Sequence, residues 1–277
     1  MTSQKLTDIL SKYSEINTIT GRLGDKIVRY EDNDHNFVYL KSGTGVSRKS
    51  LEQEALALEW LSGKGITIPE VLDFEREGDT TYLLITGVRG LPPYKFKERD
   101  KSELLEITAN ALHKFHQISL EDSGSLNTLD KYLEKIEQHL KLGVIKEIDF
   151  KEANEGKTPK DVFNFLVAER QKFDSNVLTH GDFCLPNILL EGENFGIIDL
   201  GDCGPGDKYM DLSSMEVSIK RNFGDEWVEV FNKHYDPELK IDRNKIKYYQ
   251  LIDQFGYHLD IDKFYQLTKD SGESTKK

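Results

Sequence analysis

The sequence predicts an α+β fold of two lobes, in which a smaller, antiparallel β-rich lobe with one helix among its strands precedes a larger, mainly helical one. Three observations indicate this order. Short β-rich segments separated by turn-forming residues fill the chain up to residue 88. The breakers Gly87, Gly90 and Pro92-Pro93 follow. Beyond them, apolar residues recur at three- and four-residue spacing, which is typical of amphipathic helices. We therefore expect lobes at residues 1–88 and 89–277.

The first lobe is expected to begin with a polar helix at residues 2–14 and to continue as a sheet. Each predicted strand is rich in β-forming residues and is bounded by turn formers. These strands lie at 16–20, 26–31, 36–41, 70–76 and 80–86. Between the third and the fourth, the spacing of Leu51, Ala55, Leu58 and Leu61 predicts a helix at 50–62.

The second lobe is expected to consist mostly of helices. The predicted helices lie at 101–118, 129–142, 159–173, 212–223, 227–234 and 244–257. A short β-rich island interrupts them at 188–190 and 195–198, on either side of a turn at 192–194. Because the densest group of polar residues lies in and just before this island, we expect the chemistry there.

Composition and charge narrow the class of protein. The 49 acidic and 37 basic residues give a net charge of −12, the wrong sign for binding nucleic acid or an anionic membrane surface. The apolar stretches are too short to span a bilayer, and the first ten residues lack a signal peptide's apolar core. We expect a cytoplasmic protein with a small-molecule substrate and two reduced cysteines. The sequence leaves the oligomeric state open.

Three polar residues in and beside the island have the chemistry that phosphoryl transfer needs. Asp182 is followed five positions later by Asn187, and Asp199 comes after the hairpin. A carboxylate such as Asp182 can accept the proton of an attacking hydroxyl. Amide and carboxylate oxygens such as those of Asn187 and Asp199 suit Mg²⁺, which takes its remaining ligands from water and from nucleotide phosphates.

The first lobe is then expected to supply a cation for the nucleotide phosphates. Lys41 ends an alternating strand pattern, and Glu54 on the following helix is placed to form an ion pair with it. Glu52 is the competing partner. The turn at residues 21–24 is a weak candidate for covering phosphates, because it does not have the Gly-x-Gly-x-x-Gly spacing.

These motifs occur within a longer pattern. The run His180-Gly-Asp-Phe-Cys-Leu-Pro-Asn187 and the run Ile198-Asp-Leu-Gly-Asp-Cys-Gly-Pro-Gly-Asp-Lys-Tyr-Met-Asp211 together are similar to the signature of the aminoglycoside phosphotransferases. The chain resembles in particular their 3′-phosphotransferase branch, the kanamycin and neomycin kinases. The resemblance extends over residues 13–255 and implies a two-lobed protein-kinase-like fold with the active site between the lobes.

The resemblance also implies roles for particular residues. Asp182 would be the catalytic base, Asn187 and Asp199 the magnesium ligands, and Lys41 with its partner Glu54 the phosphate-binding pair. ATP or GTP would be the donor, and its base would meet the backbone of a hinge at Thr86–Val88. His180 would brace the catalytic loop, and Asp211 would anchor the loop that follows Asp199.

The acceptor site is where the chain departs from the family pattern. Aminoglycosides are polycations, so their site needs several carboxylates. The resemblance provides Asp149, Glu152, Glu155 and Asp253, but Lys151 and Ala153 occupy positions at which family members carry acids. Members of this branch also end in an aromatic residue whose carboxylate helps to hold the drug. Because this chain runs on to Lys277, that feature does not carry over.

Three hypotheses follow for the function. The first is phosphorylation of an aminoglycoside, most directly at the 3′-hydroxyl of kanamycin- and neomycin-type drugs, which gives antibiotic resistance. The second is a kinase of the same fold that acts on a sugar, an amino alcohol or another antibiotic. The third is a nucleotide-binding module without transferase activity. The presence of Asp182 argues against the third, because a binding module needs no base.

Overall fold

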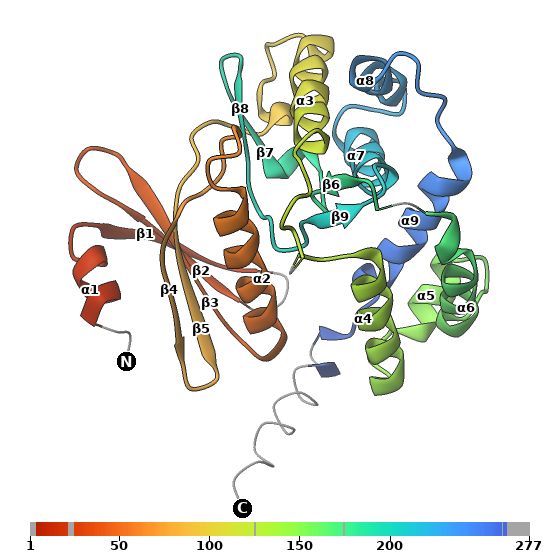
Figure 1. Cartoon of the computed structure of the whole chain (residues 1–277), viewed down its shortest axis with the longest axis horizontal. Helices are drawn as coiled ribbons and strands as arrows, with labels where there is room; N and C mark the ends of the chain where they lie inside the picture. Colours follow the sequence, from red (N-terminus) through yellow and green to blue (C-terminus); the bar gives the residue numbers. More distant parts are fainter. Residues whose placement is uncertain (1–3, 22–24, 125, 174, 262, 265–277) are drawn as a thin grey trace, which may run out of the picture. The chain divides into compact units, whose positions relative to one another are not determined.

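The packing of the chain divides a computed structural model of the protein into two units (Figure 1). The structure describes residues 4–21, 25–124, 126–173, 175–261 and 263–264. Unit 1 comprises the described residues of 1–90 together with 196–202, and unit 2 comprises those of 91–195 and 203–264. The expected assignment of residues 196–202 to the second lobe therefore differs from the packing. The division into functional lobes at residue 88 stays a prediction.

An antiparallel sheet of five strands forms the framework of unit 1. Its order is β1(Ser14–Thr20), β2(Lys26–Glu31), β3(Phe37–Thr44), β5(Thr80–Thr86), β4(Val71–Glu77). All neighbouring strands in this order are antiparallel. The predicted strands are thus present with small shifts of their ends, and the α+β class is confirmed.

Two helices cover opposite faces of this sheet. Leu6 of α1(Gln4–Leu10) packs in one apolar cluster with Val38, Leu40 and Leu84. Successive strand residues face opposite sides, so Lys41 faces away from that cluster, toward α2(Gly45–Leu61). The sequence pattern placed the start of α2 at residue 50. The helix begins five residues earlier, directly after extended Thr44. Its first turn carries no apolar repeat, so the sequence pattern did not indicate it.

Residues 196–202 belong to unit 1 through contacts with the segment before β4. The backbone N–H of Ile197 donates to the carbonyl of Thr67 at 2.9 Å, and Thr67 forms a parallel bridge with Gly196. A Cβ on Gly196 would lie 2.3 Å from a methyl group of Val88, so only glycine fits this approach. The segment that carries Asp199 is therefore held by the same unit as Lys41.

Unit 2 is built from helices with two short strand pairs. The helices are α3(Lys101–His116), α4(Leu129–Leu142), α5(Glu147–Ala153), α6(Pro159–Glu169), α7(Tyr209–Asn222), α8(Trp227–Tyr235) and α9(Arg243–Tyr257). The strand pairs are β6(Val177–Thr179) with β9(Gly204–Gly206) and β7(Ile188–Glu191) with β8(Asn194–Ile197), whose last two residues lie in unit 1. In the packing, α3 contacts α8, α7 contacts α9, and α6 contacts both α4 and α9.

Several boundaries in unit 2 differ from the sequence expectation. Helix α3 ends at residue 116 rather than 118, and α7 begins at residue 209 rather than 212. The helix expected to reach residue 173 ends at 169 and continues as a 3-10 turn at Arg170–Lys172. Short elements such as β6 and β9 have too few residues to show a pattern. Within the described residues, no helix is long and apolar enough to cross a membrane.

A buried histidine gives unit 2 a pH-dependent stability. His139 on α4 packs against the ring of Phe264, and burial lowers the pKa of His139 to about 4, helped by nearby Lys135. An unfolded histidine titrates near 6.5, so as the pH falls the unfolded chain takes up this proton first. We expect His139 to remove about 2 kcal/mol of unfolding free energy between about pH 6.5 and about pH 4.

Urea unfolding at several pH values measures this contribution. In His139→Leu the free energy of unfolding is expected to depend less steeply on pH over this range. His113→Gln, at an exposed position on α3, serves as the control and retains the wild-type slope. An unchanged slope in His139→Leu would contradict the assignment.

Candidate active site

The loop between β6 and β7 holds the predicted base and the predicted amide ligand next to each other. The carboxylate-bearing Asp182 is exposed, whereas Asn187 is buried at the end of a 3-10 turn, Leu185–Asn187. The side-chain amide of Asn187 donates to the backbone carbonyl of Asp182 at 3.0 Å and approaches its Oδ2 at 3.3 Å. Asn187 thus fixes the residue that precedes it by five positions, and the carboxylate of Asp182 stays accessible from solvent.

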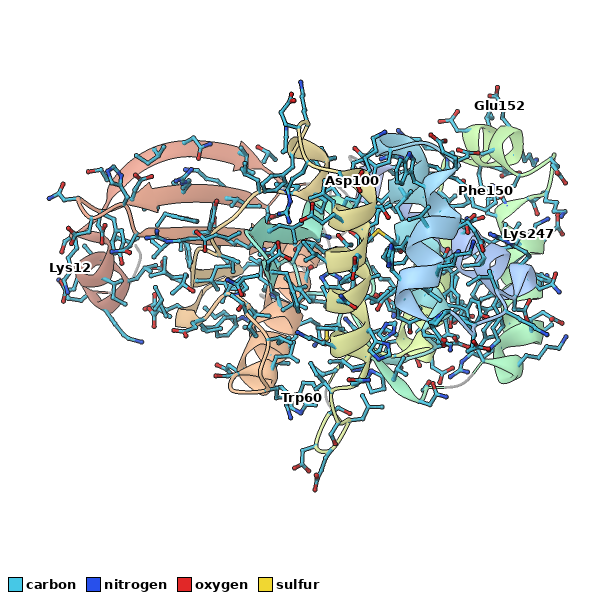
Figure 2. All side chains as sticks on the ribbon, turned by 90° about the horizontal axis from the view of Figure 1, so that it is seen from above. Lys12, Trp60, Asp100, Phe150, Glu152 and Lys247 are labelled. Carbon is cyan, nitrogen blue, oxygen red and sulfur yellow. The ribbon has the colours of Figure 1, made fainter. Side chains whose placement is uncertain are left out.

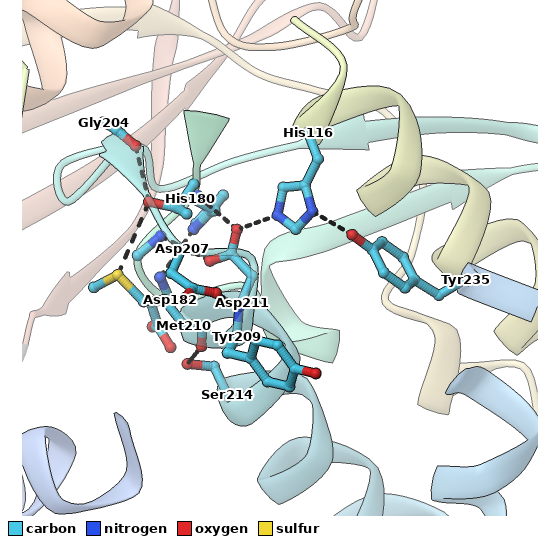
Figure 3. A network of polar contacts seen from close by, with 12 residues as sticks. His116, His180, Asp182, Gly204, Asp207, Tyr209, Met210, Asp211, Ser214 and Tyr235 are labelled. Carbon is cyan, nitrogen blue, oxygen red and sulfur yellow. Dashed lines mark hydrogen bonds and ion pairs between the residues drawn. The ribbon is translucent and has the colours of Figure 1, made fainter. Parts of the chain in front are cut away.

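Asp211 anchors the loop that carries Asp182 (Figure 3). Its side chain is fully buried at the start of α7, and its two oxygens accept the backbone N–H groups of His180 at 2.8 Å and of Gly181 at 2.9 Å. Gly181 has a φ of +88°, which favours glycine. The expectation that Asp211 anchors the loop after Asp199 is therefore corrected, because its partners lie in the loop that carries Asp182.

The ring of His180 contacts the same loop. Its Nδ1 accepts the backbone N–H of Asp182 at 3.2 Å, and the ring is completely buried beside Phe115 and Phe183. A carboxylate and an imidazole thus hold three consecutive backbone N–H groups, from residue 180 to residue 182. The position of Asp182 is set by buried groups rather than by its own side chain.

A further pair of residues extends the network to α3 and α8. His116 Nε2 lies 2.9 Å from Asp211 Oδ2, and His116 Nδ1 lies 2.8 Å from the hydroxyl of Tyr235. Burial, with Asp211 adding to it, raises the pKa of Tyr235, so this phenol keeps its proton. Every group is satisfied when Tyr235 donates to Nδ1 and Nε2–H donates to Asp211. Four elements are thereby joined around one carboxylate.

A hydroxyl from α7 holds the second half of the loop. The backbone N–H of Leu185 donates to Ser218 Oγ at 3.0 Å, and both residues are buried. Leu185 begins the 3-10 turn that ends with Asn187. Ser218 therefore determines where this turn starts and, through it, where the amide of Asn187 lies.

In unit 1, Lys41 and Glu54 form a buried ion pair. Lys41 Nζ lies 2.7 Å and 2.8 Å from the two carboxylate oxygens of Glu54, and the side chains are only 12% and 4% exposed. The competing partner Glu52 instead lies 3.7 Å from Arg48. Burial would lower the pKa of Lys41, but Glu54 and then Asp199 outweigh it and the pKa is raised. Burial raises the pKa of Glu54, and Lys41 opposes this change.

Asp199 reaches the same ammonium group from the other segment of unit 1. Its Oδ1 lies 3.5 Å from Lys41 Nζ, and its side chain is 60% exposed. The backbone of Asp199 has a φ of +65°, a left-handed conformation that costs energy for a residue other than glycine. The fold thus keeps a strained, exposed carboxylate beside a buried cation, an arrangement that occurs preferentially at functional sites.

The expected hinge shows which backbone groups remain for a ligand. The N–H of Thr86 donates to Glu70 and that of Gly87 donates to Phe37, at 2.9 Å and 2.8 Å. In the described part of the chain, the N–H of Val88 donates to no backbone carbonyl or side chain. The hinge therefore leaves one backbone donor available at Val88, which suits recognition of the edge of a base.

Asn187 in unit 2 and Asp199 in unit 1 each present an oxygen donor of the kind that suits a hard cation. In its assigned orientation, Asn187 directs its Nδ2 toward Asp182 and therefore leaves its Oδ1 as an acceptor. Asp199 presents carboxylate oxygens that are exposed. Oxygen donors of these kinds are what Mg²⁺ prefers, and it completes its shell with water and phosphate oxygens.

The expected acceptor-binding acids lie on α5, in the turn that follows it and on α9. Asp149, Glu152 and Glu155 are exposed, and their side chains form no ion pair within the described residues. Figure 2 shows Glu152 pointing outward from α5. Asp253 lies on α9, two residues before Phe255. The ring centroids of Phe255 and of Phe150 on α5 lie 4.9 Å apart. The fold thus brings the two acid-bearing segments together.

Of the turn proposed to cover phosphates, residues 22–24 lie outside the described residues. His113 and His116 lie on the same helix, α3, but in different surroundings. His116 is buried in the Asp211 network, whereas His113 is exposed and hydrogen-bonds to Gln117.

Comparison with known proteins identifies the family. A family model described as the phosphotransferase enzyme family matches residues 20–249. The chain belongs to this family. This phosphotransferase is 30% identical over 262 residues to an aminoglycoside 3′-phosphotransferase of Enterococcus faecalis, covering 91% of this chain and 97% of the relative. It is 27% identical to a protein of the same name from Niallia circulans, over 91% of this chain and 96% of the relative.

Solved structures show the same fold. The phosphotransferase superposes on a crystal structure of a type VIII aminoglycoside 3′-phosphotransferase with a TM-score of 0.78 and 20% identity, covering 91% and 97% of the two chains. A complex of a Streptomyces rimosus aminoglycoside phosphotransferase with ADP and streptomycin gives a TM-score of 0.71 and 24% identity, covering 90% and 96%. The predicted protein-kinase-like fold is thereby confirmed, and the family match confirms the predicted enzyme class.

Sequence reasoning missed two residues that position the catalytic loop of this phosphotransferase. Tyr235 is 119 residues from His116, and Ser218 is 33 residues from Leu185. No local pattern marks either residue, because a lone hydroxyl on a helix is ordinary in sequence. Only the packing of α7 and α8 reveals their partners.

Removing the ammonium of Lys41 tests the buried pair. In Lys41→Met, Glu54 is left buried without its cation, which we expect to cost about 3 kcal/mol of unfolding free energy at pH 8. Burial already raises the pKa of Glu54, so the variant can take up a proton there. A carboxyl group with a raised pKa stabilises the fold below its unfolded pKa and loses this effect as the pH rises.

Unfolding experiments at pH 6 and pH 8 separate this effect from general damage. Lys41→Met is expected to lose more stability at pH 8, whereas Lys49→Met, at an exposed position of α2, loses little at either pH. Adding Glu54→Gln to Lys41→Met should restore stability at pH 8. A loss that does not depend on pH would contradict the uncompensated carboxylate.

Proposed function

We propose that this phosphotransferase transfers the γ-phosphate of ATP or GTP to a hydroxyl of an aminoglycoside antibiotic, most directly the 3′-hydroxyl of kanamycin- and neomycin-type drugs. The observation that carries the acceptor class is the 30% identity over 91% of the chain to a protein named aminoglycoside 3′-phosphotransferase. Phosphorylation of the drug would give resistance. Nucleoside triphosphates are cytoplasmic metabolites, which supports a cytoplasmic location.

Each unit contributes one set of groups to the proposed reaction. Unit 1 contributes Lys41, held by Glu54, as the cation for the phosphates, and the Val88 N–H as a donor to the nucleotide base. Unit 2 contributes Asp182 as the base that accepts the hydroxyl proton as the new oxygen–phosphorus bond forms. The nucleoside diphosphate then leaves with the electrons of the broken bond. We thus propose unit 1 as the nucleotide lobe and unit 2 as the catalytic and acceptor lobe.

The proposed metal is Mg²⁺, with Asn187 and Asp199 as its protein ligands. When bound, Mg²⁺ screens the negative charge of the phosphates. The chain's own contribution is to hold Asn187 by the 3-10 turn and to keep Asp199 exposed in its left-handed conformation. The phosphate donor in this proposal is then ATP or GTP with bound Mg²⁺.

The exposed acids of α5 and of the turn after it favour a cationic acceptor. Asp149, Glu152 and Glu155 carry carboxylates without ion pairs in the described structure, and Asp253 lies on the adjoining helix α9. A polycation gains charge-assisted hydrogen bonds from such a set. We propose these four residues as the acceptor-binding acids.

One observation favours a second acceptor class. Ile148 on the same helix is 83% exposed, and Lys151 is ion-paired to Glu147 at 2.6 Å. An exposed branched side chain suits a substrate that has an apolar face, and a cation on the same helix disfavours a polycation. The second candidate function is therefore phosphorylation of another small molecule, such as an amino alcohol, a sugar or a different antibiotic, by the same catalytic groups.

Nucleoside diphosphate release with a panel of acceptors distinguishes the two. The purified protein is assayed with Mg²⁺ and either ATP or GTP against kanamycin, neomycin, amikacin and streptomycin. Turnover with the drugs that carry a 3′-hydroxyl supports the first function. Silence across the panel, with nucleotide still bound, would contradict it and direct the search to other acceptors.

A further inference from the structure

The segment that follows α9 folds back onto the connection between α4 and α5. His258, Leu259 and Asp260, together with Lys263 and Phe264, make these contacts, and we call these five residues the C-terminal clasp. Leu259 forms an antiparallel bridge with Ile145. The backbone N–H of Asp260 donates to the carbonyl of Val144 at 2.7 Å, so the clasp adds a short strand-like pairing to this connection.

The clasp also fixes the beginning of α5. Lys146 is the N-cap of α5 but provides no side-chain cap. Its backbone N–H instead donates to the carbonyl of His258 at 2.8 Å. Phe150 is fully buried on α5. The centroid of its ring lies 4.9 Å from that of Phe255 and 5.6 Å from that of His258. A helix of seven residues is unstable by itself, so such contacts determine its position.

The last two residues of the clasp hold α4. The ammonium of Lys263 donates to the carbonyl of Gly143 at 2.8 Å, at the C-terminal end of α4. A cation at this end of a helix is favourable. The ring of Phe264 is buried and meets His139 of α4 edge to face at 4.9 Å. The clasp therefore contacts α4, the connection and α5 in succession.

We propose that the C-terminal clasp positions the acceptor-binding acids. The clasp holds α5 so that Asp149, Glu152 and Glu155 face the bound acceptor in a fixed arrangement. This inference rests on the proposed role of those acids. None of the clasp residues carries the chemistry of transfer, so its effect should appear in acceptor binding rather than in the catalytic step. It follows that Leu259 and Phe264 are positioning residues, of which Leu259 acts through the connection before α5 and Phe264 acts through α4.

The test compares Phe264→Ala with a variant of similar burial elsewhere in unit 2. Val228→Ala on α8 is the control, and Phe264→Leu is the conservative variant. For Phe264→Ala we expect the KM for kanamycin to rise about tenfold, while kcat and the KM for nucleotide change less than about threefold. Phe264→Leu should restore most of the lost affinity, and Val228→Ala should leave the kanamycin KM unchanged.

Amide hydrogen exchange without substrate provides a second readout. Exchange at residues 144–150 is expected to be at least about tenfold faster in Phe264→Ala and unchanged in Val228→Ala. Lys263→Met, which removes one hydrogen bond, should give a smaller change in the same direction and covers the case that Phe264→Ala fails to fold.

The outcomes separate this inference from the proposed function. An unchanged exchange rate at residues 144–150 would overturn the clasp, and so would equal changes of kcat and both KM values. If the wild-type protein turns over no aminoglycoside, the proposed function fails and with it the acceptor role of the clasp. The exchange experiment then still decides whether the clasp holds α5.

Discussion

Asp182→Asn is expected to lower kcat by about 10²- to 10⁴-fold, because it removes the carboxylate of the catalytic loop that is placed to accept the hydroxyl proton. Asparagine keeps the size of the side chain and an oxygen near the amide of Asn187. Since Asp182 is exposed, the free energy of unfolding should hardly change. Single-turnover kinetics measure the loss, and titration with nucleotide should show nearly unchanged binding.

A matched control uses another exposed aspartate of unit 2. Asp122→Asn, at a position far in sequence from the catalytic loop, should retain the wild-type kcat. A kcat for Asp182→Asn within about threefold of wild type would refute the role of Asp182 as base. Loss of nucleotide binding together with turnover would instead indicate that the residue serves binding.

Asp211→Asn is expected to have the largest effect on the fold and the catalytic loop together. The carboxylate is fully buried and accepts from His180, Gly181 and His116. An asparagine has one side-chain acceptor, so at least one buried donor loses its partner. We expect a loss of about 2 to 4 kcal/mol in unfolding free energy and a fall in kcat of at least about tenfold.

The network predicts a gradient of effects along its length. Tyr235→Phe removes only the hydroxyl at the far end and should cost about 1 kcal/mol, with a small change in kcat. Denaturant unfolding and steady-state kinetics of both variants measure the gradient. Equal effects of Asp211→Asn and Tyr235→Phe, or an Asp211→Asn protein of wild-type stability and kcat, would contradict the anchoring role.

Local patterns in the sequence were sufficient for the larger elements. The spacing of Leu51, Ala55, Leu58 and Leu61 placed α2, and the alternation before Lys41 placed β3. Both patterns reflect faces that are buried over several turns or residues. The residue types of the Asp182 loop were equally readable, because phosphoryl transfer restricts the side chains that can serve.

Contacts between distant residues could not be predicted in the same way. The partners of Asp211 in the catalytic loop lie about thirty positions earlier, and no local pattern indicates which loop it holds. The assignment of Asp199 to unit 1 depends on a backbone bridge between Thr67 and Gly196. Such pairings are determined by tertiary packing, since backbone groups carry no sequence signal.

The acceptor region shows the same limit. The acids of α5 were identified through resemblance, but the clasp that holds this helix was not, because Leu259 and Phe264 look like ordinary apolar residues near the end of the chain. Their role depends on contacts with Ile145 and His139, which lie more than a hundred positions earlier.

The most direct test of the proposed activity compares two acceptors that differ in one hydroxyl. Nucleoside diphosphate release is measured with kanamycin B and with its 3′-deoxy analogue, for the wild-type protein and for Asp182→Asn. Turnover of kanamycin B by the wild-type protein alone, with none on the 3′-deoxy analogue, is the predicted result. Equal turnover of both acceptors, or no turnover of either while nucleotide still binds, would contradict transfer to the 3′-hydroxyl.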